Sequence, residues 1–195
     1  METVLSWLAE HFDLPILEWI AENLRCAAMD VVMPIITVLG DAGIFWIALA
    51  LVLLCTRKYR KAGAAMGVAL VIGVLVCNVT MKPLVARIRP YDYQLLHFGK
   101  TIQLLITAPT DYSFPSGHTL ASFEGAVALT LYHKKMGIPA LVLASLIAFS
   151  RLYLYVHYPT DVLAALVMGV GIAFLAKYIT EKAWLAGKRR ALQRQ

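Results

Sequence analysis

The segment SRLYLYVHYPTD, residues 150–161, places a histidine and a carboxylate at a spacing suited to nucleophilic catalysis. Pro159 predicts the start of a helix, because a proline at the first helical position loses no hydrogen bond. Asp161 then lies in the first turn, four residues after His157. Its carboxylate can accept the Nδ1 proton of His157, which leaves Nε2 free to attack and stabilises the cation that forms. In the alternative interpretation, Asp161 only complements the helix dipole and His157 is an interfacial residue.

A second segment, SFPSGHT at residues 113–119, predicts an anion site at the start of a helix. Ser116 is a good N-cap, and Gly117 has no side chain to obstruct an approaching ligand. The helix then begins at about His118, and its free N–H groups and positive dipole end favour an anion. His118 would stand beside that anion, where it can transfer a proton near neutral pH. The alternative is an ordinary capped helix start that carries an interfacial histidine.

A third segment, KPLVARIRP at residues 82–90, carries the cations that a phosphate requires. Lys82 and Arg89 are seven residues apart, so on one helix they would project from the same face, with Arg87 off that face. Pro90 is expected to end this helix. Together with Arg151 they could bind a multiply charged anion, arginine in bidentate fashion and lysine as a point charge. The alternative is that these cations snorkel to the membrane interface.

The elements that must position these residues are membrane helices. The chain is 60% hydrophobic and only 15% charged, well below the roughly 25% charged residues of a typical soluble domain. Five apolar stretches approach the length of about 20 residues that a membrane span needs. We therefore expect an all-α, polytopic membrane bundle of five to six transmembrane helices, with five spans at about residues 43–56, 62–81, 119–133, 137–155 and 160–181.

Residues 1–39 are expected to form one or two amphipathic helices at the interface. Apolar residues recur there at helical spacing, and they are Leu14, Leu17, Leu24, Ala28, Val31 and Ile35. A sixth span over about residues 26–39 is the alternative. The predicted organisation is an N-terminal segment (1–39), a membrane-embedded core (40–182) and a basic cytoplasmic tail (183–195).

Basic residues predict the orientation of this bundle. The loop after residue 56, the turn at 134–135 and the tail after residue 176 hold twelve lysines and arginines, and the opposite side holds five. The richer side is expected to be cytoplasmic. All three polar segments then lie at the outer face. Four of the five cations there, all but Lys100, lie at or beside predicted helix ends and require a ligand. The net charge of +6 is explained by topology, so we expect no nucleic-acid partner.

The three segments together match a family pattern. Lys-x6-Arg-Pro is present as Lys82, Arg89 and Pro90, Pro-Ser-Gly-His as residues 115–118, and Ser-Arg-x5-His-x3-Asp as residues 150–161. This sequence resembles the type 2 phosphatidic acid phosphatase (lipid phosphate phosphatase) superfamily over about residues 37–180. The N-terminal segment carries none of the resemblance.

The resemblance implies a role for each residue. His157 would be the nucleophile, Asp161 its orienting carboxylate and His118 the general acid. The phosphate would be bound by Lys82, Arg89, Arg151, Ser116 and the backbone N–H of Gly117. The family works without a metal or other cofactor. Its small bacterial members act in the plasma membrane, near the outer leaflet, on undecaprenyl diphosphate, phosphatidylglycerol phosphate or phosphatidic acid.

Two polar residues fall outside the family pattern. Glu124 lies six residues into the helix after His118, and an ionisable residue at that depth could contact substrate, pair with a buried partner or tune the site. Asn78, one turn before Lys82, could place that lysine by a hydrogen bond or simply pack between helices.

Two other functions compete with a lipid phosphatase. A vanadium-dependent haloperoxidase has a similar phosphate-like pocket, but those proteins are soluble and much larger. A lipid-phosphate binding or transport protein would need the cations without turnover. Binding alone does not require His118 or the pair of His157 and Asp161, so an enzyme is the favoured interpretation.

Overall fold

The computed structural model describes residues 2–193, and within them every regular element is a helix. The chain forms ten α-helices joined by loops, two π-helical segments and one 3₁₀ turn. In order these are α1 (Glu2–Leu8), the π segment η1 (Ala9–Asp13), α2 (Leu14–Asn23), α3 (Ala27–Val38), the 3₁₀ turn η2 (Asp41–Gly43), α4 (Ile44–Cys55), α5 (Arg60–Val74), the π segment η3 (Leu75–Met81), α6 (Lys82–Val85), α7 (Pro90–Phe98), α8 (Gly117–Thr130), α9 (Lys134–Tyr153) and α10 (Pro159–Leu192).

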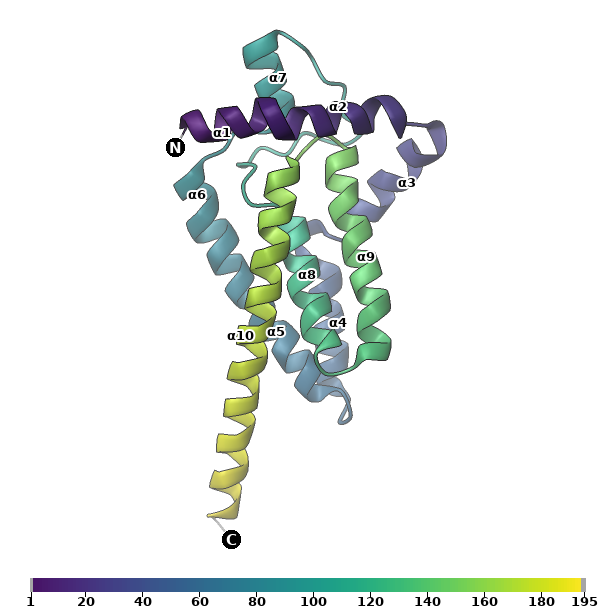
Figure 1. Ribbon diagram of the computed structural model, residues 1–195. Helices are drawn as coiled ribbons and strands as arrows, with labels where there is room; N and C mark the ends of the chain where they lie inside the picture. Colours follow the sequence, from purple (N-terminus) through teal and green to yellow (C-terminus); the bar gives the residue numbers. More distant parts are fainter. Residues whose placement is uncertain (1, 194–195) are drawn as a thin grey trace.

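Helix α8 lies at the centre of the bundle and packs against α5, α9 and α10 (Figure 1). Small residues such as Gly125, Ala126 and Ala144 are buried at these contacts, and they let the helices approach closely. Trp46 of α4 is also buried, and its indole N–H donates to the hydroxyl of Ser122 at 3.0 Å. The core thus holds the N-terminus of α8 in a fixed place.

Three segments are long and apolar enough to cross a membrane, namely Arg60–Phe98, Lys134–Tyr153 and Pro159–Leu192. The pair formed by α3 and the η2–α4 segment passes the same test and is bent by 41°. Large apolar side chains such as Val71, Val142 and Val167 are exposed on these helices, as expected for residues that face lipid. The chain is therefore a multi-pass membrane helical bundle. The predicted count of five to six spans is not confirmed, because α8 has only 14 residues.

The N-terminal rod formed by α1, η1 and α2 lies across one end of the bundle (Figure 1). Leu14 and Leu17 are buried there, as the amphipathic pattern predicts. The chain turns between α2 and α3, so Val31 and Ile35 lie on a second helix and are exposed.

The C-terminal segment continues the last helix. Helix α10 runs to Leu192, so the predicted tail is helical from residue 183 to that point and extends away from the bundle (Figure 1). Residues 194–195 of the predicted tail lie outside the described residues, as does Met1.

Candidate active site

The three polar segments meet at the end of the bundle that the N-terminal rod covers. They line a cavity of about 1350 Å³ that continues between α4, α5 and η3 along apolar side chains such as Leu51, Leu70 and Val74. Six of the predicted catalytic and phosphate-binding residues line it: Lys82, Arg89, Gly117, His118, Arg151 and His157.

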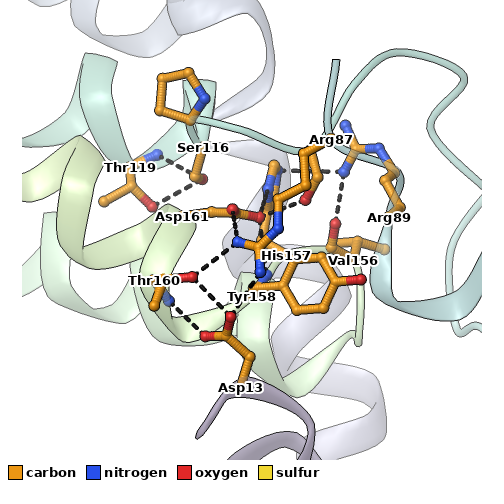
Figure 2. A network of polar contacts seen from close by, with 12 residues as sticks. Asp13, Arg87, Arg89, Ser116, Thr119, Val156, His157, Tyr158, Thr160 and Asp161 are labelled. Atoms are coloured by element: carbon orange, nitrogen blue, oxygen red, sulfur yellow. Dashed lines mark hydrogen bonds and ion pairs between the residues drawn. The ribbon is translucent and has the colours of Figure 1, made fainter. Parts of the chain in front are cut away.

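His157 lies in the short turn between α9 and α10 and is 1% exposed. Its Nδ1 is 3.4 Å from Oδ2 of Asp161, so the predicted contact is present (Figure 2). The same Asp161 oxygen accepts hydrogen bonds from the hydroxyl of Ser113 and from the backbone N–H of Tyr158, the latter at 3.0 Å. These donors fix the carboxylate in the position from which it can orient the imidazole.

The other ring nitrogen of His157 faces the cations. Nε2 lies 3.3 Å from Nη1 of Arg89, which also donates to the carbonyl of Val156 at 2.6 Å. Burial lowers the pKa of His157 well below its ordinary value, and the charges of Arg89 and Arg151 lower the pKa further. The imidazole is therefore neutral near pH 7, as a nucleophile must be.

Lys82 and Arg89 converge on one side chain, but not because they share a helix face. Helix α6 ends at Val85, and Ala86 has a left-handed backbone with φ of 47°. Pro90 then begins α7 instead of ending a helix. The prediction of one helix over residues 82–90 is therefore wrong, and a reversal of the chain brings the two cations together.

That shared partner is Asp111, from the loop between α7 and α8. Its carboxylate forms ion pairs with both Lys82 and Arg89, and the Nε of Arg89 also donates to the Asp111 carbonyl at 2.8 Å. Partial burial acts to raise the pKa of Asp111, but hydrogen bonds from Lys82 and Arg89 outweigh it and lower the pKa to about 2. Since its side chain is 51% exposed, Asp111 is an accessible anion paired with Lys82 and Arg89.

Arg87 has other partners than Lys82 and Arg89 do, and it too belongs to the site. Its Nη1 donates to Oδ1 of Asp161 at 2.6 Å, and its Nη2 donates to Oδ2 of Asp13 at 2.7 Å (Figure 2). The carboxylate that orients His157 is thus tied to the N-terminal rod.

His118 and Arg151 form the other wall of the site. Nε2 of His118 lies 2.7 Å from Oδ1 of Asp41, a contact that places a proton on Nε2 because a carboxylate only accepts. Nη1 of Arg151 donates to the hydroxyl of Thr37 at 2.6 Å and lies 3.4 Å from the same His118 nitrogen. The Nε of Arg151 is buried and has no hydrogen-bond partner within the described residues, so it is available to a ligand.

Ser116 and Gly117 shape the helix terminus. Ser116 is the N-cap of α8, with its hydroxyl 3.4 Å from the N–H of Thr119 and 2.9 Å from the Thr119 hydroxyl (Figure 2). Because this hydroxyl is buried in the cap, Ser116 serves the site by fixing the helix start. A Cβ on Gly117 would lie 3.9 Å from Nζ of Lys82, so a side chain there would crowd this lysine.

The two accessory candidates lie along the cavity. Glu124 is 1% exposed, packs against Gly73 and leaves its Oε2 without a hydrogen-bond partner among residues 2–193. A Cβ on Gly73 would stand 2.1 Å from that oxygen, so the glycine makes room for the carboxyl. Asn78 lines the cavity near Lys82, but no hydrogen bond joins the two within the described chain.

Metal-ligating side chains do not gather at this site. Over the described residues 2–193, no three histidine, cysteine, aspartate or glutamate side chains are grouped closely enough to hold a metal ion. The acidic residues contact cations or histidines instead, as Asp161 does with Arg87 and Asp111 with Lys82.

Four residues of the site were not found from the sequence: Asp13, Asp41, Asp111 and Ser113. Ser113 stands three residues before Ser116 and could have been found by its place in the second segment. The three aspartates could not be assigned, because each reaches its partner across 22 or more positions of the chain.

Comparison with known proteins places these residues in a family. Residues 62–185 match the PAP2 superfamily. An undecaprenyl-diphosphatase of Sulfolobus acidocaldarius is 38% identical over 135 residues, which are 69% of this chain and 63% of that protein, slightly less than two thirds of its length. Undecaprenyl-diphosphatase BcrC of Bacillus subtilis is 32% identical over 153 residues, 76% of this chain and 74% of that protein.

A solved structure agrees with this result. The crystal structure of a transmembrane PAP2 type phosphatidylglycerolphosphate phosphatase from Bacillus subtilis is similar with a TM-score of 0.67 at 27% identity, over 93% of this chain and 88% of that chain. The three motif segments that meet at the cavity, residues 82–90, 113–119 and 150–161, all fall within the matched region. This chain therefore belongs to the PAP2 superfamily, the type 2 phosphatidic acid phosphatases.

Proposed function

We propose that this chain is an integral-membrane phosphatase that hydrolyses a lipid phosphate or diphosphate through a phosphohistidine intermediate, without a metal. One observation carries the proposal. A buried, neutral His157, oriented by Asp161, directs Nε2 toward Arg89 at the polar end of a cavity that continues along mainly apolar side chains. Cations there bind phosphate oxygens, and the apolar walls suit a lipid chain.

In the first step, the phosphate displaces Asp111 and is bound by the phosphate clamp, which we define as Lys82, Arg89 and Arg151. Nε2 of His157 attacks phosphorus, and the bond between phosphorus and the leaving oxygen breaks as the N–P bond forms. The dianionic phosphate favours the imidazolium form of His118, which gives its Nε2 proton to that oxygen and becomes neutral, and the oxygen departs as a lipid alcohol or, from a diphosphate, as a lipid monophosphate. The clamp stabilises the charge that spreads over the transferred group.

In the second step, water attacks the phosphohistidine. His118 is now unprotonated and takes a proton from the water as its oxygen bonds to phosphorus. The N–P bond breaks, inorganic phosphate leaves and His157 is again neutral. Asp161 stabilises the positive charge on the His157 ring in both steps. No metal is required, because the side-chain cations and the N-terminus of α8 supply the positive charge that stabilises the phosphoryl group.

The site is proposed to face the extracytoplasmic side of a bacterial plasma membrane. The turn between α4 and α5, the turn between α8 and α9 and the C-terminal end of α10 lie together at the end of the molecule opposite the site (Figure 1). With the first turns of α5 and α9 and the second half of α10, these segments carry eleven of the lysines and arginines among the described residues. By the positive-inside rule, that end is cytoplasmic.

Phosphate release tests the function. Purified protein is assayed with undecaprenyl diphosphate, phosphatidylglycerol phosphate and phosphatidic acid, with and without chelator. We expect release from at least one lipid that chelator does not change, and loss of at least about 10³-fold in His157→Ala and about 10²-fold or more in His118→Ala. Folded protein that binds these lipids but releases no phosphate would instead be a binding or transport protein, and inhibition by chelator would contradict the metal-free mechanism.

A further inference from the structure

The N-terminal rod reaches the catalytic residues through one carboxylate. Asp13 closes the π segment η1 and is 0% exposed, although the rod lies at the end of the bundle. Its Oδ1 accepts the backbone N–H of Thr160 at 2.9 Å, and its Oδ2 accepts the Thr160 hydroxyl at 2.8 Å. Asp13 therefore satisfies a free N–H in the first turn of α10, two residues after the catalytic turn ends.

The Asp13 carboxylate also forms an ion pair with Arg87, and Arg87 forms a second ion pair with Asp161. Arg87 donates from Nη2 to Asp13 at 2.7 Å and from Nη1 to Asp161 at 2.6 Å. The guanidinium carbon lies 3.7 Å from the centre of the Tyr158 ring, and Tyr158 is fully buried. Stacking and two ion pairs thus fix the guanidinium in one orientation (Figure 2).

This arrangement affects how much of the Asp161 charge is available to His157. A buried guanidinium with a single carboxylate partner would draw that carboxylate into a neutral pair. Since Asp13 supplies a second negative charge, the group of Asp13, Arg87 and Asp161 carries a net charge of −1. Asp161 can then stabilise positive charge on His157 as the N–P bond forms.

We propose that Asp13 is a positioning residue for phosphoryl transfer, which holds Arg87 and the start of α10 so that Asp161 stays aligned and charged beside His157. The proposal rests on the phosphatase function proposed above. It extends the working site to the N-terminal rod, which lies outside the residues that match the family.

The Asp13→Asn variant tests this role. Its amide oxygen can still accept from Thr160, so the rod can dock, but the charge on Arg87 is no longer shared. We expect kcat to fall about tenfold or more, as for other residues that orient a catalytic ligand, with KM within about twofold because the phosphate clamp is untouched. Arg87→Lys can reach only one carboxylate, so it should also lower kcat and leave KM nearly unchanged. The two substitutions together should lower kcat by less than the product of their separate factors.

Two controls separate positioning from stability. Glu10→Gln removes a carboxylate from the same rod, where it accepts from the Tyr93 hydroxyl at 2.7 Å, and should leave kcat unchanged. Leu17→Ala opens a cavity under the rod and should lower the melting temperature while kcat per folded molecule, counted in the monodisperse fraction, is retained.

The outcomes are distinct. Wild-type kcat in either Asp13→Asn or Arg87→Lys, or equal losses of kcat in Leu17→Ala and Asp13→Asn per folded molecule, would overturn the positioning role. Absence of phosphate release from the wild type and Glu10→Gln on every lipid would instead refute the proposed function itself.

Discussion

At the residue scale, the cations that are proposed to bind phosphate are partly neutralised by the chain itself. Asp111 pairs with Lys82 and Arg89, and Asp41 pairs with His118, and both carboxylates are about half exposed. Each carboxylate contacts a side chain that would contact the substrate in the proposed mechanism. A phosphate must therefore replace these carboxylates before reaction.

Asp111→Asn should consequently strengthen substrate binding. The pKa of about 2 keeps Asp111 charged at every practical assay pH, so it competes with phosphate throughout. Exposed ion pairs contribute about 0.2–1 kcal/mol, so KM should fall by up to about fivefold. Asp92→Asn, the same charge change on α7, should leave KM unaltered. A raised KM in Asp111→Asn would show that Asp111 assists binding instead.

The lowered pKa of His157 predicts the acid side of the pH profile. Attack requires the neutral ring, and the pKa lies below the ordinary value of 6.5, so the enzyme should stay active as pH falls through 6.5. We expect the acid limb of kcat/KM to have its midpoint below 6.5. Comparing a monoester with a diphosphate separates the ionisation of substrate from that of the enzyme. If the acid limb that belongs to the enzyme has its midpoint at or above pH 6.5, the pKa of His157 is not lowered in this way.

The sequence was sufficient for local contacts at this scale. The contact of His157 with Asp161 follows from their spacing of four residues across a helix start, because residues four apart lie on the same side of a helix. The partners Asp13, Asp41 and Asp111 depend on how distant elements pack. Asp13 did carry one signal, since it shares a buried face with Leu17 and Ile20, where a lone carboxylate must have a partner.

At the element scale, the capped and proline-led helices begin where the sequence predicts, at Gly117 after Ser116 and at Pro159. The break at Ala86 was missed, because alanine favours helix and no glycine marks the reversal. After the left-handed backbone at Ala86, Arg87 contacts Asp161 and Arg89 contacts Val156, so the reversal places both cations at the site.

Substitutions at Ala86 should reveal that reversal. A β-branched side chain fits poorly at a φ of 47°, so Ala86→Val should lower the free energy of unfolding by about 1–2 kcal/mol and weaken phosphate binding. Ala86→Gly removes the clash and should retain activity and melting temperature. Equal melting temperatures and KM values in the two variants would contradict a functional role for this backbone conformation.

At the scale of the whole molecule, composition and apolar stretches predict the all-helical membrane fold, but not the exact spans. Helix α8 is shorter than a span and is surrounded by other helices, and α3 and α4 form one bent pair. Length and hydropathy cannot distinguish a buried central helix from one that crosses lipid.

Orientation at this scale can be measured by labelling. In a cysteine-free background, Thr101→Cys lies in the loop beside the site end and Lys188→Cys lies near the end of α10. The charge distribution predicts that an impermeant thiol reagent labels the Thr101→Cys variant on intact cells, and the Lys188→Cys variant only after lysis. The reverse pattern would place the site on the cytoplasmic side.

In the proposed mechanism, His157 carries the phosphoryl group. The most direct measurement is a rapid-quench single turnover with lipid labelled in its terminal phosphate, followed by peptide mapping of the trapped protein. We predict an acid-labile, base-stable label on His157 that forms and decays at rates consistent with turnover, and that is absent from His157→Asn. Full turnover by His157→Asn, or rapid phosphate release by the wild type with no label on His157 at any time, would contradict the account.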